Sequence, residues 1–470
     1  MAVSAGDTAW VLVSAAMVLL MTPALAFFYG GMVRMKSVLN MMMMSFGALA
    51  LVGVIWVLWG YTMAFSAGNG FVGSPTEAFG LRGLMDATML QATDATGNVV
   101  AGTGIPVFAF VAFQAVFAII TVALISGAIA DRAKFGAWMI FAGVWATVVY
   151  FPVAHWVWAS DGWIFANIKA IDFAGGTVVH INAGIAGLAL ALILGRRIGF
   201  GKTLFRPHNV PFVMLGAGLL WFGWFGFNAG SALAANGTAA ITWITTMVAT
   251  ATASLAWMAT EKIRDGHATS LGAASGVVAG LVAITPACSS VNVLGALAIG
   301  IAAGVLCALA VGLKYRFGYD DSLDVVGVHL VGGIVGTLMI GLVLTEESPA
   351  GVAGGGLKGL FYGGGVDQLG RQAIAAGAVM TYSLVCTLII GMLIHKTIGF
   401  RITRDDEQQG VDQTTHAETA YELSESPYGG TLMGALAPAS AAGPAGAAEG
   451  SGLDSTQVNV SAVNREGVNA

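Results

Sequence analysis

Charged side chains are scarce in this chain of 470 residues, of which Asp, Glu, Lys and Arg together make up only 10%. A soluble globular domain carries about 25% charged residues, and hydrophobic residues reach 57% of this chain. These proportions exclude a soluble protein and place most of the chain in a lipid bilayer. The net charge of −5 is small, so it does not indicate a nucleic-acid partner.

Cysteine is also rare. Cys288, Cys307 and Cys386 lie in apolar runs, without the spacing of metal ligands or of a redox pair. We therefore expect no disulfide, and we interpret the three thiols as small buried hydrophobic groups.

Basic residues are missing before the first apolar run, where Asp7 is the only charged group. The run itself, residues 9–28, resembles a secretory signal peptide with a cleavage sequence at 24–26. A signal peptide needs a basic segment in front of it, whereas here Arg34 and Lys36 follow. The run is therefore predicted to be a first membrane-spanning helix that enters from the outside.

Long apolar runs are what the chain has in abundance. A helix needs about 20 apolar residues to cross the bilayer core. Eleven runs fit, near residues 9–31, 38–65, 104–130, 135–157, 176–195, 210–230, 239–260, 268–287, 293–313, 323–345 and 371–396. The sequence thus predicts an all-α polytopic membrane protein with eleven transmembrane helices.

Basic residues are distributed unevenly between the loops. One set of alternate loops carries Arg34, Lys36, Arg132, Lys134, Arg196, Arg197, Lys202, Arg206, Lys262, Arg264, Lys314, Arg316, Lys396, Arg401 and Arg404, and the other only Arg82, Lys169, Lys358 and Arg371. Because cytoplasmic loops have an excess of Lys and Arg, we expect the N-terminus outside and the C-terminus inside.

The composition changes after the last apolar run. We expect a membrane domain over residues 1–398, a charged cytoplasmic regulatory region over 399–426 and a disordered tail over 427–470. The tail is mostly Ala, Gly, Ser and Pro, and such a composition buries too little apolar surface to offset the entropy of ordering.

One pattern, Asp-x7-His-x3-Gly, begins at Asp172 and again at Asp321. Five predicted spans separate the copies, and an odd number reverses the direction of the second copy, as in an inverted repeat. His180 and His329 are then expected to face each other near the middle of the bilayer. The alternative is two unrelated histidines, each hydrogen-bonded within the bundle. We favour the pair, because ionisable groups inside a membrane are costly and usually mark a pathway.

Metal binding is a rival role for these histidines, since imidazole suits zinc or copper. The spans offer no acidic or thiol ligands beside them, which argues against it. Catalysis is also disfavoured, because no Ser, Lys or pair of carboxylates stands with the histidines in the order of a catalytic triad. We expect no metal, no cofactor and no enzyme activity.

Five segments form a series in the chain: 28–31 (FYGG), 172–180 (DFAGGTVVH), 223–231 (GWFGFNAGS), 285–288 (TPAC) and 324–329 (DVVGVH). In this order they closely resemble the ammonium transporter (Amt/Mep/Rh) family, Amt branch, over residues 9–425. The resemblance implies a homotrimer. Each subunit would have two inverted halves of five helices, a long final helix and its own pore.

The resemblance also implies roles for single residues. It places an outer cation site at Phe113, Trp158 and Ser231, a gate at Phe117 and Phe227, and a pore at His180 and His329. Trp156 is the alternative to Trp158, since both lie in segment 155–158. Asp172 either takes part in binding and deprotonating the cation or holds backbone amides in place. We favour the structural role, because the Gly-Gly-Thr sequence that follows suits a helix start.

These residue types suit ammonium. Each aromatic face attracts a small cation by about 0.5–2 kcal/mol, and a hydroxyl accepts a hydrogen bond that potassium cannot donate. We hypothesise that ammonium, or methylammonium, binds outside and loses its proton near the gate. Ammonia then passes the neutral histidines while the proton crosses separately, which serves nitrogen uptake.

The resemblance further implies that residues 410–421 contact the neighbouring subunit, that Thr414 is phosphorylatable and that a PII-type signalling protein binds this face. Two other functions stay open. A sensor usually carries a soluble output domain, which is not visible here, and an Rh-like channel for neutral gases is disfavoured by the aromatic cation site. The expected location is a bacterial plasma (inner) membrane.

Overall fold

Ten helices in the described part of the chain are long and apolar enough to cross a membrane. The structure is a computed structural model that describes residues 3–89, 104–203 and 205–421. The ten spans are Ala5–Met32, Met35–Phe65, Val107–Ile129, Phe135–Trp158, Gly176–Leu194, Val210–Gly230, Gly237–Asp265, Val293–Phe317, Val326–Val343 and Asp367–Thr397. The multi-pass helical membrane architecture expected from hydropathy is therefore present.

The eighth predicted run, 268–287, is occupied by a shorter apolar helix, Ser270–Ile284, of 15 residues. At 1.5 Å per residue this helix is about 22 Å long, less than the roughly 30 Å of a hydrocarbon core. An eleventh crossing therefore stays a prediction.

The elements follow one another as helices with few strands. The α-helices are α1 (Ala5–Met32), α2 (Val38–Ile55), α3 (Tyr61–Phe65), α4 (Val107–Ile125), α5 (Phe135–Trp145), α6 (Phe151–Trp158), α7 (Asn182–Leu194), α8 (Val210–Gly230), α9 (Gly237–Asp265), α10 (Ser270–Ile284), α11 (Val293–Ala310), α12 (Leu313–Phe317), α13 (Val331–Val343), α14 (Pro349–Ala353), α15 (Asp367–Thr397) and α16 (Arg404–Gln409). The π turns are η2 (Trp56–Gly60), η5 (Ala146–Tyr150), η6 (Ile164–Ile168), η7 (Gly176–Ile181), η8 (Val326–Leu330) and η10 (Asp412–His416).

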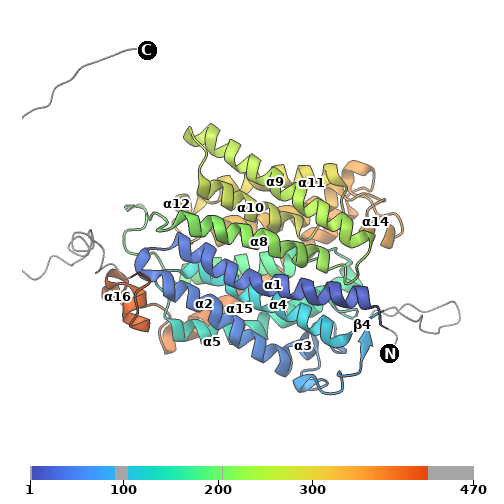
Figure 1. The fold of residues 1–470 in the computed structure, drawn as a ribbon, viewed down its shortest axis with the longest axis horizontal. Helices are drawn as coiled ribbons and strands as arrows, with labels where there is room; N and C mark the ends of the chain where they lie inside the picture. Colours follow the sequence, from blue (N-terminus) through green and yellow to red (C-terminus); the bar gives the residue numbers. More distant parts are fainter. Residues whose placement is uncertain (1–2, 90–103, 204, 422–470) are drawn as a thin grey trace, which may run out of the picture. The chain divides into compact units, whose positions relative to one another are not determined.

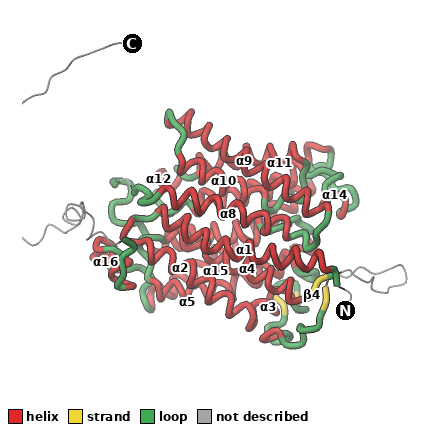
Figure 2. The backbone as a smooth tube through the Cα atoms, in the orientation of Figure 1, coloured by secondary structure: helices red, strands yellow, loops and turns green. Residues whose placement is uncertain are grey.

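The 3-10 turns are η1 (Met35–Ser37), η3 (Phe79–Leu81), η4 (Ser126–Ile129) and η9 (Leu360–Tyr362). Two antiparallel pairs of short strands join β1 (Gly68–Asn69) to β2 (Val72–Gly73) and β3 (Thr88–Met89) to β4 (Ile105–Pro106). Figure 2 shows these strands in yellow beside a helical bundle.

The long helices lie side by side within the unit Met1–Ala420 (Figure 1), with α12 and α16 at one end and α3, β4 and α14 at the other. Close approach of α1 and α8 depends on small residues. A Cβ atom on Gly216 would lie 2.5 Å from the backbone nitrogen of Phe28, and one on Gly230 would lie 2.5 Å from the Ser14 side chain. Small residues permit such packing in lipid, where no hydrophobic force brings helices together.

The two copies of the sequence pattern adopt the same local structure. Each begins with a π turn that contains the histidine, η7 or η8, and continues into a helix of 13 residues, α7 or α13. A Cβ on Gly184 would meet the backbone of Leu330 at 2.5 Å, and one on Gly333 would meet Ile181 at 3.0 Å. This reciprocal packing, in which each glycine touches the residue after the other histidine, is typical of a two-fold relation.

The chain beyond α15 is described only to residue 421. Thr403 caps α16 in a capping box with Asp406, and Lys134 N–H donates to the carbonyl of Phe400. The predicted tail 427–470, and the last residues of the predicted region 399–426, lie outside the described residues.

Candidate transport site

The centre of the site is the pair of histidines from the two π turns. His180 and His329 are 0% and 4% exposed, and their Nδ1 atoms are 3.3 Å apart. A hydrogen bond between two ring nitrogens requires one ring to accept, so the two rings cannot both be cationic. The Nε2 atom of His180 is buried and has no hydrogen-bond partner among the described residues. It is therefore free to bind a small polar molecule.

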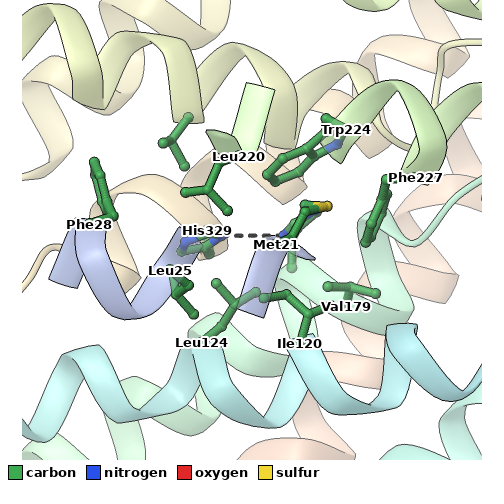
Figure 3. A pocket seen from close by; sticks show the side chains of 12 residues that line it. Met21, Leu25, Phe28, Ile120, Leu124, Val179, Leu220, Trp224, Phe227 and His329 are labelled. Atoms are coloured by element: carbon green, nitrogen blue, oxygen red, sulfur yellow. Dashed lines mark hydrogen bonds between the residues drawn. The ribbon is translucent and has the colours of Figure 1, made fainter. Parts of the chain in front are cut away.

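A narrow cavity surrounds the histidines (Figure 3). Its walls come from α1, α4, α8, α10 and the two π turns, with Phe28 at one end, Phe227 and Trp224 at the other and His329 between them. The centre of a water-sized sphere can occupy only about 10 Å³ of this cavity, which is close to the minimum needed to hold one water molecule. Apart from the histidines and Trp224, the lining is hydrocarbon, sulfur or phenyl. The cavity thus suits one small molecule without its hydration shell.

Stacked phenyl rings close the Phe227 end of this cavity. The ring centroids of Phe117 and Phe227 are 4.2 Å apart with an angle of 30° between the planes, and both side chains are buried. The ring of Phe113, one turn along α4, lies 4.9 Å from that of Phe117. Phe227 also lies 6.1 Å from the ring of His180. The predicted gate residues and pore residues are therefore contiguous.

Of the two candidate tryptophans, only Trp158 lies beside the stack. Its ring meets Phe117 edge to face at 5.9 Å, and its Nε1–H donates to the Asp172 carbonyl at 2.9 Å. Trp156 instead donates to the Phe71 carbonyl and packs against Trp163.

Ser231 follows the last residue of α8 as its C-cap, at this same end of the bundle. Its hydroxyl donates to the Phe227 carbonyl at 2.8 Å, which leaves its oxygen able to accept. We call Phe113, Phe117, Trp158, Phe227 and Ser231 the aromatic end of the site.

Asp172 holds the start of η7. Its carboxylate accepts backbone N–H groups from all four residues of 175–178 and the hydroxyl of Thr177. The side chain is 8% exposed. With its oxygens occupied in this way, the carboxylate shapes the turn that carries His180.

Trp224 is a part of the site that the sequence did not single out. Its ring stacks on that of His180 at 5.4 Å, and its Nε1–H donates to the Thr285 hydroxyl at 2.8 Å. Both residues lie in motifs quoted for the family resemblance, in segments 223–231 and 285–288. The presence of both residues in these motifs was the only signal in the sequence for a role of Trp224, since one tryptophan among 12 is by itself uninformative.

Comparison with known proteins decides the family. The Ammonium Transporter Family matches residues 9–421 of the chain. The chain belongs to this family. It is 62% identical over 434 residues to the "Ammonium transporter" of Mycobacterium tuberculosis, covering 89% of this chain and 91% of that protein. The "Ammonium transporter" of Aquifex aeolicus is 47% identical over 421 residues, with 89% and 94% covered.

Solved structures of the family have the same fold. Candida albicans Mep2 matches with a TM-score of 0.78 at 32% identity, covering 86% of this chain and 88% of that one. A structure titled "Sensor Amt Protein" matches with a TM-score of 0.77 at 26% identity, covering 87% and 98%.

At the opposite end of this transporter's bundle, charged side chains form buried ion pairs. Arg197 binds the carboxylates of Asp131 and Asp320, both at 2.9 Å, and Arg34 lies 3.5 Å from Asp131. Arg132, which is 0% exposed, donates to Ser322 and to the Asp320 carbonyl. We call Arg34, Asp131, Arg132, Arg197 and Asp320 the charged end.

Electrostatics at the charged end favour ionised carboxylates. Burial alone would raise the pKa of Asp131, but Arg34 and Arg197 outweigh it and hold that pKa below its ordinary value. Burial opposes ionisation of Asp320 as well, and hydrogen bonds from Arg197 again lower its pKa overall. Burial lowers the pKa of Arg132 to about 10, despite the nearby carboxylate of Asp320.

The C-terminal segment of the transporter contacts this end of its own chain. Glu407, 0% exposed, accepts from Arg401 and from the backbone of Ile198, both at 2.7 Å. The Asp412 carboxylate accepts from the backbone N–H groups of Leu39 and Asn40 in the first turn of α2, at 3.0 and 2.8 Å. Burial raises the pKa of Asp412. The half-buried Thr414 donates its hydroxyl to the Gly410 carbonyl at 3.1 Å.

Proposed function

We propose that this ammonium transporter recruits ammonium at the aromatic end, removes its proton near the Phe117/Phe227 stack and conducts ammonia past His180 and His329. The proton crosses separately, and the process serves nitrogen uptake. The observation that carries the proposal is the unpartnered Nε2 atom of His180 beside a cavity of one-molecule size.

The geometry of the aromatic end supports recruitment of a cation. Ammonium can lie against the faces of Phe113 and Trp158, where cation-π attraction contributes about 0.5–2 kcal/mol for each ring. The Ser231 oxygen supplies a directional acceptor, which favours ammonium over potassium. Beyond this point the stacked rings leave no room for a hydration shell, so a neutral molecule passes more easily than an ion.

Neutral histidines suit the next step. The shared hydrogen bond leaves one ring nitrogen donating and the other accepting, and each ring keeps a second nitrogen for the passing molecule. Reversal of the shared proton would exchange these roles, which offers a route for a proton separate from that for ammonia.

The wider setting is part of the proposal. We propose that the charged end faces the cytoplasm, with the N-terminus outside and the C-terminus inside a bacterial inner membrane, which the excess of basic residues beside that end supports. We further propose a homotrimer, a regulatory role for residues 399–426 with Thr414 as a phosphorylation site, and a PII-type protein as a partner on that face. The resemblance to the family supports these statements.

The test is current from purified protein in liposomes after an ammonium pulse. Wild type is expected to carry a current that potassium does not elicit. His180→Ala, and His180→Asp combined with His329→Ala, are expected to lose it, while ammonia flux persists in His180→Ala. Unchanged current in His180→Ala would contradict the proposed proton route.

A second function is favoured by the likeness to the structure titled "Sensor Amt Protein". If wild type binds ammonium but carries no current, the sensor becomes the better proposal, and a channel for neutral gases the next. Competition by methylammonium separates the sensor from the neutral-gas channel, because the aromatic site recognises a cation.

A further inference from the structure

The two copies of the inverted repeat present their histidines through different supports. In the first copy the Asp172 carboxylate accepts four backbone N–H groups and the Thr177 hydroxyl. In the second copy the Asp321 carboxylate accepts only two backbone N–H groups, from Val325 at 3.1 Å and Val326 at 2.7 Å. Val326 occupies the position of Thr177 and has no hydroxyl. The second turn therefore lacks most of the bonds that hold the first.

The turns also differ at their third residue after the aspartate. Gly175 has φ +116° in the first copy, and Asp324 has φ +63° in the second. Glycine adopts positive φ without steric cost, whereas a residue with a Cβ needs compensating contacts, although Asp tolerates the left-handed region better than most. The carbonyl of each accepts the N–H of the residue before the histidine, at 2.9 Å.

Lys314 supplies the contacts that the second turn lacks. Its side chain comes from α12, is 8% exposed as a residue, and donates to the Asp321 carbonyl at 3.1 Å and to the Asp324 carboxylate at 2.7 Å. One ammonium group thus ties the first and fourth residues of the turn together. A buried lysine is costly unless it is paired in this way.

We propose that Lys314 and Asp324 are positioning residues that hold the turn before His329, so that its ring keeps the hydrogen bond to His180. Neither residue touches the cavity. The pair replaces, on the inner side, what Gly175 and Thr177 provide on the outer side. The inference rests on the proposed transport mechanism, in which the hydrogen bond between His180 and His329 has a function.

The ionisable groups around Asp321 are Asp324, Lys314, Tyr319 and, from α1, Tyr29. The pKa of Asp321 is raised to about 6, because burial and the nearby Asp324 raise it more than Lys314 and the two backbone N–H groups lower it. Asp321 holds its two N–H groups best as a carboxylate. Loss of Lys314 removes a lowering influence, so the acid limb of transport should move to higher pH.

The first experiment compares Lys314→Met with wild type by current in liposomes between pH 5 and 8. We expect the current to fall about tenfold or more, as small misplacements of reacting groups cost rates of this order, and its acid limb to shift upward. Lys262→Met, at an exposed lysine near the end of α9, is the matched control and should behave as wild type. Wild-type current and pH profile in Lys314→Met would overturn the proposal.

The repeat itself provides a rescue. Val326→Thr in the Lys314→Met background returns the hydroxyl that Asp172 receives from Thr177, and should restore most of the lost current and move the acid limb back. No rescue in a folded double variant would overturn the role of the turn. If Lys314→Met does not fold, Asp324→Gly takes its place, since glycine accepts the positive φ while the ion pair with Lys314 is lost. Undiminished current in that variant would likewise overturn the proposal.

A second readout needs no transport. In protein with ¹⁵N-labelled histidine, the Nδ1 signals report the hydrogen bond between His180 and His329. Lys314→Met is expected to change them and Lys262→Met is not. If wild type carries no current, the proposed function fails, but unchanged histidine signals in Lys314→Met would separately overturn the positioning role.

Discussion

The aromatic end and the charged end of the transporter are stabilised by different forces. At the aromatic end, the rings of Phe117 and Phe227 are held by ring contacts instead of hydrogen bonds, and each such contact contributes about 0.5–1.5 kcal/mol beyond area burial. At the charged end, Arg197 holds two carboxylates that are 1% and 0% exposed. Moving those groups apart would leave buried charges without partners. For the proposed pore, the contrast predicts rearrangement at the aromatic end and a fixed frame at the charged end.

The largest effect is expected from breaking the frame. Arg197→Met leaves the Asp131 and Asp320 carboxylates buried without their main partner, which should cost about 3–5 kcal/mol of unfolding free energy. Denaturant unfolding in detergent measures this. Arg264→Met is the control, because the Arg264–Asp265 pair is 42% and 45% exposed and such pairs contribute about 0–1 kcal/mol. Equal losses in the two variants would contradict the distinction.

A smaller effect is expected at the mouth of the aromatic end. Trp158→Leu removes one cation-π partner worth about 0.5–2 kcal/mol, so the apparent affinity for ammonium should weaken roughly 2- to 30-fold. The concentration dependence of the current gives this value. Trp156→Leu is the matched control, since Trp156 contacts Phe71 and Trp163 instead of the stack. If Trp156→Leu weakens affinity more, the cation site lies at the other tryptophan.

A slightly smaller effect is expected from a substitution in the ring stack of Phe117 and Phe227. Phe227→Leu removes a ring contact worth about 0.5–1.5 kcal/mol, which should raise the open fraction of the gate roughly 2- to 12-fold. The expected sign is a rise in potassium leak relative to ammonium current. Phe225→Leu, on the same helix and stacked on Trp243 at 4.4 Å, controls for the loss of any α8 ring. A leak of equal size in both would argue against a gate at Phe227.

The smallest effect concerns pH and the charged end. A carboxyl whose pKa is lowered by folding, as for Asp131 and Asp320, adds stability above its ordinary pKa and loses it as pH falls through the folded value. The melting temperatures of wild type and Asp320→Asn should therefore converge by a few degrees as pH falls from about 5 to 3. Asp405→Asn, at an exposed residue of α16, should show no such convergence.

Hydropathy and basic loops predicted most helices closely, as in 210–230 against Val210–Gly230 and 176–195 against Gly176–Leu194. They could not predict the π turns within these spans. The extra residue in η2, for example, accompanies the packing of Gly60 against Phe151, where a Cβ would lie 2.5 Å from the ring. Such a contact joins two spans and leaves no mark in local composition.

Site residues could be predicted from the sequence where a motif repeats. They could not be predicted where a side chain only positions another residue. The spacing of Asp172 and Asp321 before their histidines predicted the facing pair, and the four-residue separation of Phe113 and Phe117 predicted neighbouring rings. Lys314 counted in the sequence only as one basic loop residue. Its hydrogen bonds to the turn before His329 depend on how α12 folds back, which hydropathy does not encode.

The ring stack of Phe117 and Phe227 has a consequence for speed. With centroids 4.2 Å apart, the rings leave no standing aperture between them. Under the proposed function, each crossing would therefore require a thermally activated rotation of a side chain. Throughput should then climb with temperature more steeply than the viscosity of water falls. The transport rate should also saturate at ammonium concentrations at which the outer site is already occupied whenever a ring rotates.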